Sequence, residues 1–282
     1  MEIIRKTRPA APLRAAIFDF DGTLSLIREG WQQIMIPYFN EVLNVTPHQE
    51  SLEDIAHCVR EFVDLLTGKQ TIYQCIRLAE EVTRRGGTPL EPLAYKAEYH
   101  RRLSERIAGR IAELKSGGDP EKHTVPGSYQ VLEMLRNRGM TLYLASGTDE
   151  IYVREEAELL QLTQYFDGGT GTPVSNIYGA KDDYKTFSKA MVIARIIEEQ
   201  KLNGPELVGF GDGYVEIENI SKINGFAVGV ASNESERCGI DEWKRSRLIN
   251  AGADWIIPDF TGCCAGGTEM PELEAGLFCP AS

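Results

Sequence analysis

Apolar positions in residues 31 to about 116 recur with the 3.6-residue period of amphipathic helices. Ser51 with Asp54 is typical of a helix start. Thr88-Pro89-Leu90-Glu91 predicts a second start, with Pro89 at the first helical position. The block shows almost no β-type alternation, so it predicts a small helical bundle. The periodic apolar positions are Leu52, Ile55, Val59, Phe62, Val63, Leu66, Tyr99, Leu103, Ile107 and Ile111.

From about residue 126 the pattern changes, and short apolar runs alternate with amphipathic segments. Such alternation predicts an α/β fold, a parallel sheet with helices on both faces. The expected strands are 15–20, 141–145, 207–210, 226–230 and, more weakly, 255–257; the expected helices are 128–138, 149–162, 187–201 and 215–224. Because the strand at 15–20 most simply joins this sheet, we expect a core domain of residues 1–26 and 126–282 and an inserted helical cap of residues 27–125.

Composition narrows the possible partners. The chain has 282 residues, is 42% hydrophobic and carries a formal net charge of −12. This charge argues against nucleic acid and anionic membranes as partners, and an anionic substrate would need a local positive centre. No apolar stretch is long enough to span a bilayer, and the first residues lack a signal-peptide core, so we expect a cytoplasmic protein.

The six cysteines show no Cys-x-x-Cys spacing. In a reducing cytosol we expect free thiols rather than disulfides or zinc ligands. We assign no role to Cys263, Cys264 and Cys279, which lie in a Gly-rich tail.

The segment Asp19-Phe20-Asp21-Gly22-Thr23 follows the first apolar run. Residues two apart in extended backbone point the same way, so Asp19 and Asp21 would present two carboxylates near the carboxyl end of a strand. Two such charges need a cation or a shared proton. The alternative is a plain Asp-Gly turn with a polar strand end. Ligands of parallel sheets bind beyond the carboxyl ends of the strands, which favours a catalytic site.

Two other strand ends carry candidate chemistry. Ser146-Gly147-Thr148 could bind a phosphate through hydroxyl and backbone N–H groups before a helix, although a hydroxyl there could merely cap that helix. Asp212, with Glu216 one helical turn later, could complete an oxygen-rich site of the kind Mg²⁺ prefers. The alternative is a loop aspartate plus a first-turn glutamate stabilised by the helix dipole.

A lysine near the start of the helix at 187–201 could neutralise a bound phosphate. Lys189, Lys185 and Lys181 compete for this role on position alone, and each could be a solvated surface charge.

Taken together and in order, these elements resemble the four motifs of the haloacid dehalogenase-like hydrolases: Asp19-Phe20-Asp21-Gly22-Thr23, Ser146, a lysine, and Gly211-Asp212 followed by Glu216. The resemblance covers about residues 13–26 and 126–260. Lys189 precedes Asp212 by 23 residues, a spacing similar to that of family phosphatases, so it is preferred to Lys185. The helical insertion resembles the cap of the phosphoglycolate phosphatase and β-phosphoglucomutase branch.

The resemblance implies a role for each residue. Asp19 would be the nucleophile that becomes an aspartyl-phosphate, and Asp21 the general acid and base. Mg²⁺ would be held by Asp19, the backbone carbonyl of Asp21, Asp212 and Glu216, the last directly or through water. Ser146, the Gly147 N–H and Lys189 would hold the phosphoryl oxygens.

Departures from the family pattern narrow the reaction. Many relatives have Asp where Glu216 stands, which leaves its mode of ligation open. Family dehalogenases lack the second Asp of the first motif, and phosphonate-cleaving members replace it with a small residue, so Asp21 argues against both chemistries.

The expected function is a Mg²⁺-dependent phosphatase acting on a small phosphorylated metabolite. The alternatives are a phosphomutase of the β-phosphoglucomutase type and a non-catalytic binding protein on the same fold.

Overall fold

The computed structural model describes residues 1–47, 49–166, 175–181, 183–261 and 272–278. The chain divides into two compact units, one of residues 1–29 and 113–282 and one of residues 30–112. The boundaries expected from the sequence, 27–125 for the insertion, stay a prediction. Cys263, Cys264 and Cys279 lie outside the described residues, whereas Cys58, Cys75 and Cys238 are free thiols.

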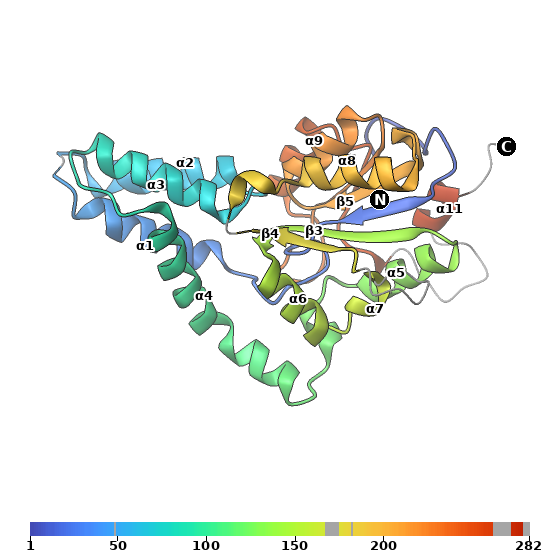
Figure 1. The fold of residues 1–282 in the computed structure, drawn as a ribbon, viewed down its shortest axis with the longest axis horizontal. Helices are drawn as coiled ribbons and strands as arrows, with labels where there is room; N and C mark the ends of the chain where they lie inside the picture. The colour runs from blue at the N-terminus through green and yellow to red at the C-terminus, as the bar shows by residue number, and fades with distance from the viewer. Residues whose placement is uncertain (48, 167–174, 182, 262–271, 279–282) are drawn as a thin grey trace. The chain divides into compact units, whose positions relative to one another are not determined.

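The larger unit is built on a seven-stranded sheet of order β1-β7-β6-β5-β2-β3-β4 (Figure 1). Every neighbouring pair is parallel except β1 with β7. The strands are β1 (Glu2–Ile3), β2 (Ala15–Phe18), β3 (Thr141–Asp149), β4 (Ile177–Ala180), β5 (Leu207–Gly211), β6 (Phe226–Val230) and β7 (Trp255–Ile257). The predicted α/β fold with a parallel sheet is confirmed.

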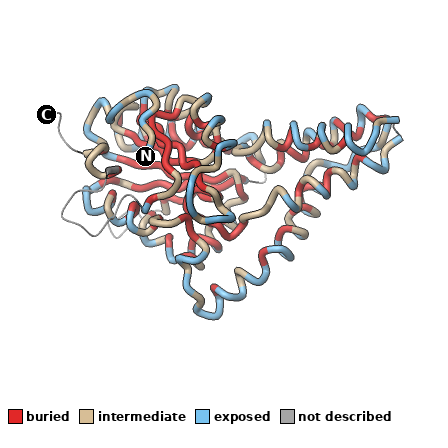
Figure 2. Tube along the Cα trace, turned by 180° about the vertical axis from the view of Figure 1, so that it is seen from behind, coloured by how far each residue is buried: buried red, intermediate tan, exposed pale blue. Residues whose placement is uncertain are grey.

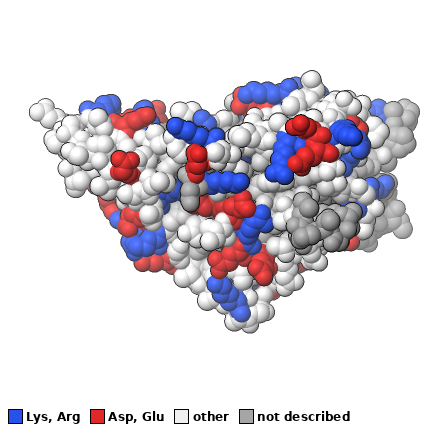
Figure 3. Space-filling model, in the orientation of Figure 1, with Lys and Arg blue, Asp and Glu red and all other residues white. Residues whose placement is uncertain are grey.

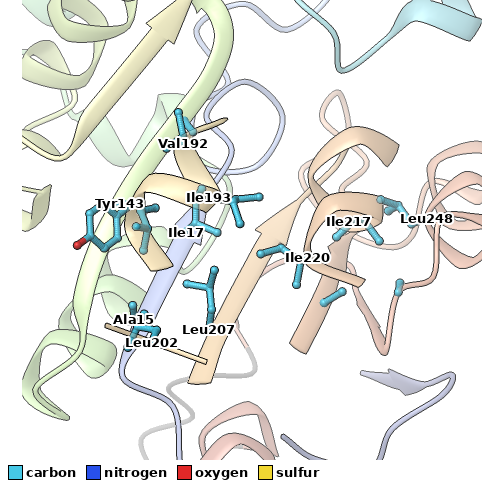
Figure 4. Close-up of a cluster of buried hydrophobic side chains, with 14 of the residues drawn as sticks. Ala15, Ile17, Tyr143, Val192, Ile193, Leu202, Leu207, Ile217, Ile220 and Leu248 are labelled. Atoms are coloured by element: carbon cyan, nitrogen blue, oxygen red, sulfur yellow. The ribbon is translucent and has the colours of Figure 1, made fainter. Parts of the chain in front are cut away.

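Helices cover both faces of this sheet. They are α5 (Ser128–Asn137), α6 (Glu150–Leu159), α7 (Thr163–Phe166), α8 (Lys189–Gln200), α9 (Tyr214–Lys222), α10 (Glu242–Asn250) and α11 (Glu272–Phe278). Apolar side chains of α8, α9 and α10 pack on one face, where Ile193, Ile220 and Leu248 join Ile17 and Leu207 of the strands in one cluster (Figure 4). Helices α5, α6 and α7 lie on the other face.

Burial explains why the central strands contain almost no polar residue. Strands β2, β5 and β6 are buried at every position, and Figure 2 shows the sheet as the main buried region of the larger unit. Phe18 and Phe210 of adjacent strands stack with ring centroids 4.6 Å apart. A strand covered on both faces must be apolar throughout, and for this reason the apolar runs could be recognised in the sequence.

The smaller unit contains α1 (Gln32–Asn44), α2 (Leu52–Leu66), α3 (Thr71–Arg84) and most of α4 (Pro92–Lys115). The predicted start of α2 is confirmed, because the Asp54 backbone N–H donates to Ser51 Oγ at 3.1 Å and the Ser51 N–H donates to Asp54 at 3.3 Å. The predicted helix start at Pro89 is wrong. The helix begins at Pro92, and the Leu90 N–H donates to the Tyr95 hydroxyl at 3.0 Å.

Other differences concern element ends. Strand β3 continues through Asp149 rather than ending at Ala145, with an irregular register against β4 between these two residues. Strands β1 and β4 and helices α7, α10 and α11 were not expected, because each is short or weakly periodic.

No helix among the described residues is long and apolar enough to cross a membrane. On the face drawn in Figure 3, acidic and basic side chains lie in mixed groups.

Candidate active site

The sheet order brings the sequence-predicted residues to one edge. Strands β5, β2 and β3 are consecutive neighbours and run parallel, so their carboxyl ends meet. Asp212, Asp19 and Ser146 lie at or near these three ends. Lys189 is the first residue of α8, which follows the Ser188 N-cap. Segments far apart in the sequence therefore contribute to one site.

Asp19 lies in a buried ion-pair network. Its backbone N–H continues the β2–β5 pairing by donating to Phe210 O at 2.9 Å. Lys189 Nζ lies 2.6 Å from Asp19 Oδ2 and 2.8 Å from Glu216 Oε2, and all three side chains are less than a tenth exposed. The other oxygen of Glu216 accepts a hydrogen bond of 2.6 Å from the Gly213 N–H. One ammonium thus bridges two buried carboxylates.

Asp212 faces Thr23 and a second buried lysine. The Asp212 backbone N–H donates to Thr23 Oγ1 at 2.9 Å, and this hydroxyl donates back to Asp212 Oδ1 at 3.3 Å. The carboxylate approaches Gly22, whose φ is +75°. A Cβ on Gly22 would meet the Asp212 carboxylate and lie 2.9 Å from Glu234 Oε1. The Gly of the first motif is therefore required both by its left-handed backbone and by this close approach.

Sequence reasoning missed the second lysine. Lys244 of α10 places its Nζ 2.9 Å from Asp212 Oδ2 and 2.6 Å from Glu234 Oε1. Ser232 Oγ accepts from the same ammonium at 3.3 Å and donates to Gly22 O at 2.7 Å. The only hint was a lysine on the inner face of a weakly amphipathic segment, which is too common to signal a site.

Asp21 has partners of its own, on β3. Thr148 Oγ1 donates to Asp21 Oδ2 at 2.8 Å, and Ser146 Oγ lies 3.4 Å from the same oxygen. Gly147 lies between these residues within the strand. The sequence indicated Thr148 only as a possible helix cap, but in the structure it contacts Asp21. The reason is that β3 continues past Ser146, and α6 begins at Glu150 after an Asp149 N-cap.

Of the three candidate lysines, all within the described residues, Lys189 is the one that forms ion pairs with the acidic residues of the site. Lys185 lies in a short 3₁₀ turn, with its Nζ 5.8 Å from the centroid of the Tyr184 ring. Lys181 is exposed.

Burial controls the electrostatics of the acidic residues. It raises the pKa of Asp19 well above its usual range, against the attraction of Lys189 and with help from the charges of Glu216 and Asp212. The pKa of Asp212 is raised for the same reason, against the attraction of Lys244. Burial alone would lower the pKa of Lys189, but the charges of Asp19 and Glu216 outweigh it and raise that pKa. The two lysines compensate the carboxylates only in part.

A divalent cation fits this arrangement. One oxygen from each of Asp19, Asp212 and Glu216 lies within 4.8 Å of the other two. The donors are all carboxylate oxygens, which suit a hard cation such as Mg²⁺. A cation there would also offset the burial and the mutual repulsion that raise the pKa values of Asp19 and Asp212.

Comparison with known proteins identifies the family of this chain. A model of the haloacid dehalogenase-like hydrolase family matches residues 13–221. The match covers well over half of the chain, which therefore belongs to this family. The family expected from the four motifs is thus confirmed. No curated protein gave a significant match to the sequence.

Several solved structures share the fold at low sequence identity. A predicted phosphoglycolate phosphatase from Haemophilus somnus is 15% identical, with a TM-score of 0.57 over 89% of this chain and 96% of its own. The β-phosphoglucomutase of Clostridium difficile is 13% identical, with a TM-score of 0.55 over 88% and 92%. A family hydrolase from Deinococcus radiodurans, solved with bound phosphate and sodium, is 17% identical, with a TM-score of 0.52 over 96% and 100%.

Proposed function

We propose that this family hydrolase is a Mg²⁺-dependent phosphatase that hydrolyses a small phosphomonoester through an aspartyl-phosphate. The observation that carries the proposal is the convergence of Asp19, Asp212 and Glu216 beside Lys189, with Asp21 held by hydroxyls of the next strand. Mg²⁺ would be held by these three carboxylates and the Asp21 carbonyl, and it would neutralise charge on the phosphoryl group.

In the first step Asp19 attacks phosphorus. A bond forms between an Asp19 carboxylate oxygen and phosphorus as the bond from phosphorus to the ester oxygen breaks. Asp21 gives its proton to that leaving oxygen. Lys189, Ser146 and the Gly147 N–H hold the phosphoryl oxygens as negative charge spreads over them.

In the second step Asp21 accepts a proton from water, and the water oxygen attacks phosphorus. The bond between Asp19 and phosphorus breaks, inorganic phosphate leaves, and both carboxyl groups return to their starting states. The helical unit of residues 30–112 would act as the cap that selects the rest of the substrate and excludes bulk water.

A screen of phosphorylated metabolites with Mg²⁺, measuring released phosphate, tests the proposal. We expect hydrolysis of at least one small phosphomonoester, loss of activity with a chelator, and loss of nearly all activity in Asp19→Asn, by about four or more orders of magnitude. Dependence on a sugar bisphosphate without net phosphate release would indicate a phosphomutase instead. Failure to hydrolyse any phosphomonoester would favour a non-catalytic protein.

A further inference from the structure

Arg28, in the loop that follows the first motif, forms a buried ion pair with α6. Its Nε donates to both oxygens of Glu156 at 3.0 and 3.1 Å, and its Nη2 donates to Glu156 Oε1 at 2.7 Å. The side chains are 9% and 4% exposed. The guanidinium also lies over the Tyr152 ring, with Cζ 5.4 Å from the centroid. Two residues of α6 therefore fix the position of this cation.

The fixed cation faces the carboxyl group of Asp21. Arg28 Nε lies 3.8 Å from Asp21 Oδ1. This oxygen is buried and has no hydrogen-bond partner among the described residues. The other oxygen, Oδ2, is the one that accepts from the Thr148 hydroxyl. The carboxyl group thus has hydroxyls on one side and a positive charge on the other.

A group that gives and then takes a proton must be held in one orientation through both steps. Hydroxyl contacts to Oδ2 alone leave the carboxyl free to turn about its last bond. A guanidinium opposite Oδ1 restricts that turn by electrostatic attraction, and Glu156 keeps the guanidinium from moving away.

We propose that Arg28, held by Glu156, is a positioning residue that orients the Asp21 carboxyl for proton transfer. This inference rests on the proposed phosphatase function. It assigns Arg28 no contact with the substrate, and its effect on the reaction passes through Asp21.

The proposal predicts that the variants will depend strongly on the leaving group. An alkyl phosphomonoester releases an alkoxide, which needs the proton from Asp21. p-Nitrophenyl phosphate releases p-nitrophenolate, a stable anion that leaves without one. Loss of orientation at Asp21 therefore slows the first step far more for the alkyl ester than for p-nitrophenyl phosphate, and kcat/KM measures this step. The second step needs Asp21 as a base whatever the ester.

The test variant is the double substitution Arg28→Met and Glu156→Met. Removing Arg28 and Glu156 together leaves neither member of this buried pair without its counter-charge, so the fold should persist, and circular dichroism checks this. We expect the ratio of kcat/KM for p-nitrophenyl phosphate to that for a hydrolysed alkyl phosphomonoester to rise about tenfold to a hundredfold. We also expect kcat with p-nitrophenyl phosphate to fall, with a burst of p-nitrophenol in the first turnover.

Three further variants separate positioning from a structural role. Arg28→Lys keeps the charge, so its ratio should lie closer to wild type than that of the double variant. Arg28→Gln removes the charge and keeps an N–H donor for Glu156, so its ratio should also rise, and this second measurement replaces the double variant if that variant does not fold. Lys115→Met removes the exposed ion pair of 2.9 Å between Lys115, at the end of α4, and Glu155 of α6, and should leave the ratio unchanged.

An unchanged ratio in the double variant, with wild-type hydrolysis intact, overturns the role of Arg28 and leaves the phosphatase proposal standing. An unchanged ratio in Arg28→Gln, where the double variant does not fold, also overturns it. A wild-type protein that hydrolyses no phosphomonoester of the metabolite screen overturns the phosphatase proposal, and the role of Arg28 falls with it.

Discussion

Lys244→Met tests whether the second buried lysine is coupled to the metal site. The Lys244 ammonium lies between Asp212 and Glu234, at 2.9 and 2.6 Å. Burial alone would lower the pKa of Lys244, but the two carboxylates outweigh it and raise that pKa, so the lysine is charged. Methionine fills a similar volume and removes the charge. Two carboxylates would then face each other in a buried setting without a counter-ion.

The magnitude follows from the loss of one partner of a buried pair, which costs about 3–5 kcal/mol. At about 2.1 cal/mol/K of unfolding entropy per residue, the metal-free variant of this 282-residue chain should melt roughly 5–8 °C below wild type. Mg²⁺ should recover part of this loss, because it neutralises Asp212 and no longer competes with an ammonium for that carboxylate. A tenfold gain in Mg²⁺ affinity would add about 1.4 kcal/mol at saturating metal.

Thermal unfolding in a chelator and in Mg²⁺, together with calorimetric titration of the metal-free protein, measures both effects. Lys222→Met is the matched control, since it removes an exposed pair with Glu218 on α9, at 3.0 Å, and should change neither quantity appreciably. An equal loss of melting temperature with and without Mg²⁺, at unchanged affinity, would refute the coupling. Weaker Mg²⁺ binding would also refute the reasoning, because it would mean that Lys244 chiefly orients Asp212.

Two further predictions concern the neighbourhood of Asp21. Gly22→Ala should lower the free energy of unfolding by more than about 1 kcal/mol and weaken Mg²⁺ binding, because the φ of +75° disfavours alanine and the new Cβ meets Asp212. Denaturant unfolding and metal titration measure the two effects. Wild-type values in both measurements would contradict the prediction. Burial raises the pKa of Glu156, although the charge of Arg28 acts in the opposite direction. The folded protein therefore binds the Glu156 proton more tightly than the unfolded chain does. This difference stabilises the fold below the ordinary glutamate pKa, and the stabilisation is lost as pH rises through the raised pKa. The free energy of unfolding of wild type, relative to that of Glu156→Gln, should therefore be greater at about pH 4 than at about pH 8. The opposite trend in denaturant unfolding would show that the charge of Arg28 outweighs burial in setting this pKa.

The fold could be predicted because its signals are local. Strands buried on both faces are apolar at every position, and amphipathic helices repeat with a fixed period. The end of β3 was misplaced because Ser146-Gly147-Thr148 is compatible with either a strand or a helix start, and pairing with β4 decides between them. The start of α4 was misplaced because prolines stand at both 89 and 92.

The same distinction separates the site residues that could be predicted from those that could not. Asp19 and Asp212 could be placed because the carboxyl ends of adjacent parallel strands meet, which follows from topology alone. Lys244, Glu234 and the partners of Arg28 could not, because each contact joins elements whose packing the sequence does not specify. The catalytic roles remain predictions until they are measured.

The central claim is that Asp19 carries the phosphoryl group during turnover. In Asp21→Asn the base for the second step is lost, so the intermediate should accumulate with Mg²⁺ and p-nitrophenyl phosphate. Acid-quenched protein analysed by mass spectrometry should carry one phosphoryl group on Asp19, and Asp19→Asn in the same background should carry none. Phosphate released by wild type with no phosphoryl adduct in the quenched variant, or an adduct on another residue, would contradict the account.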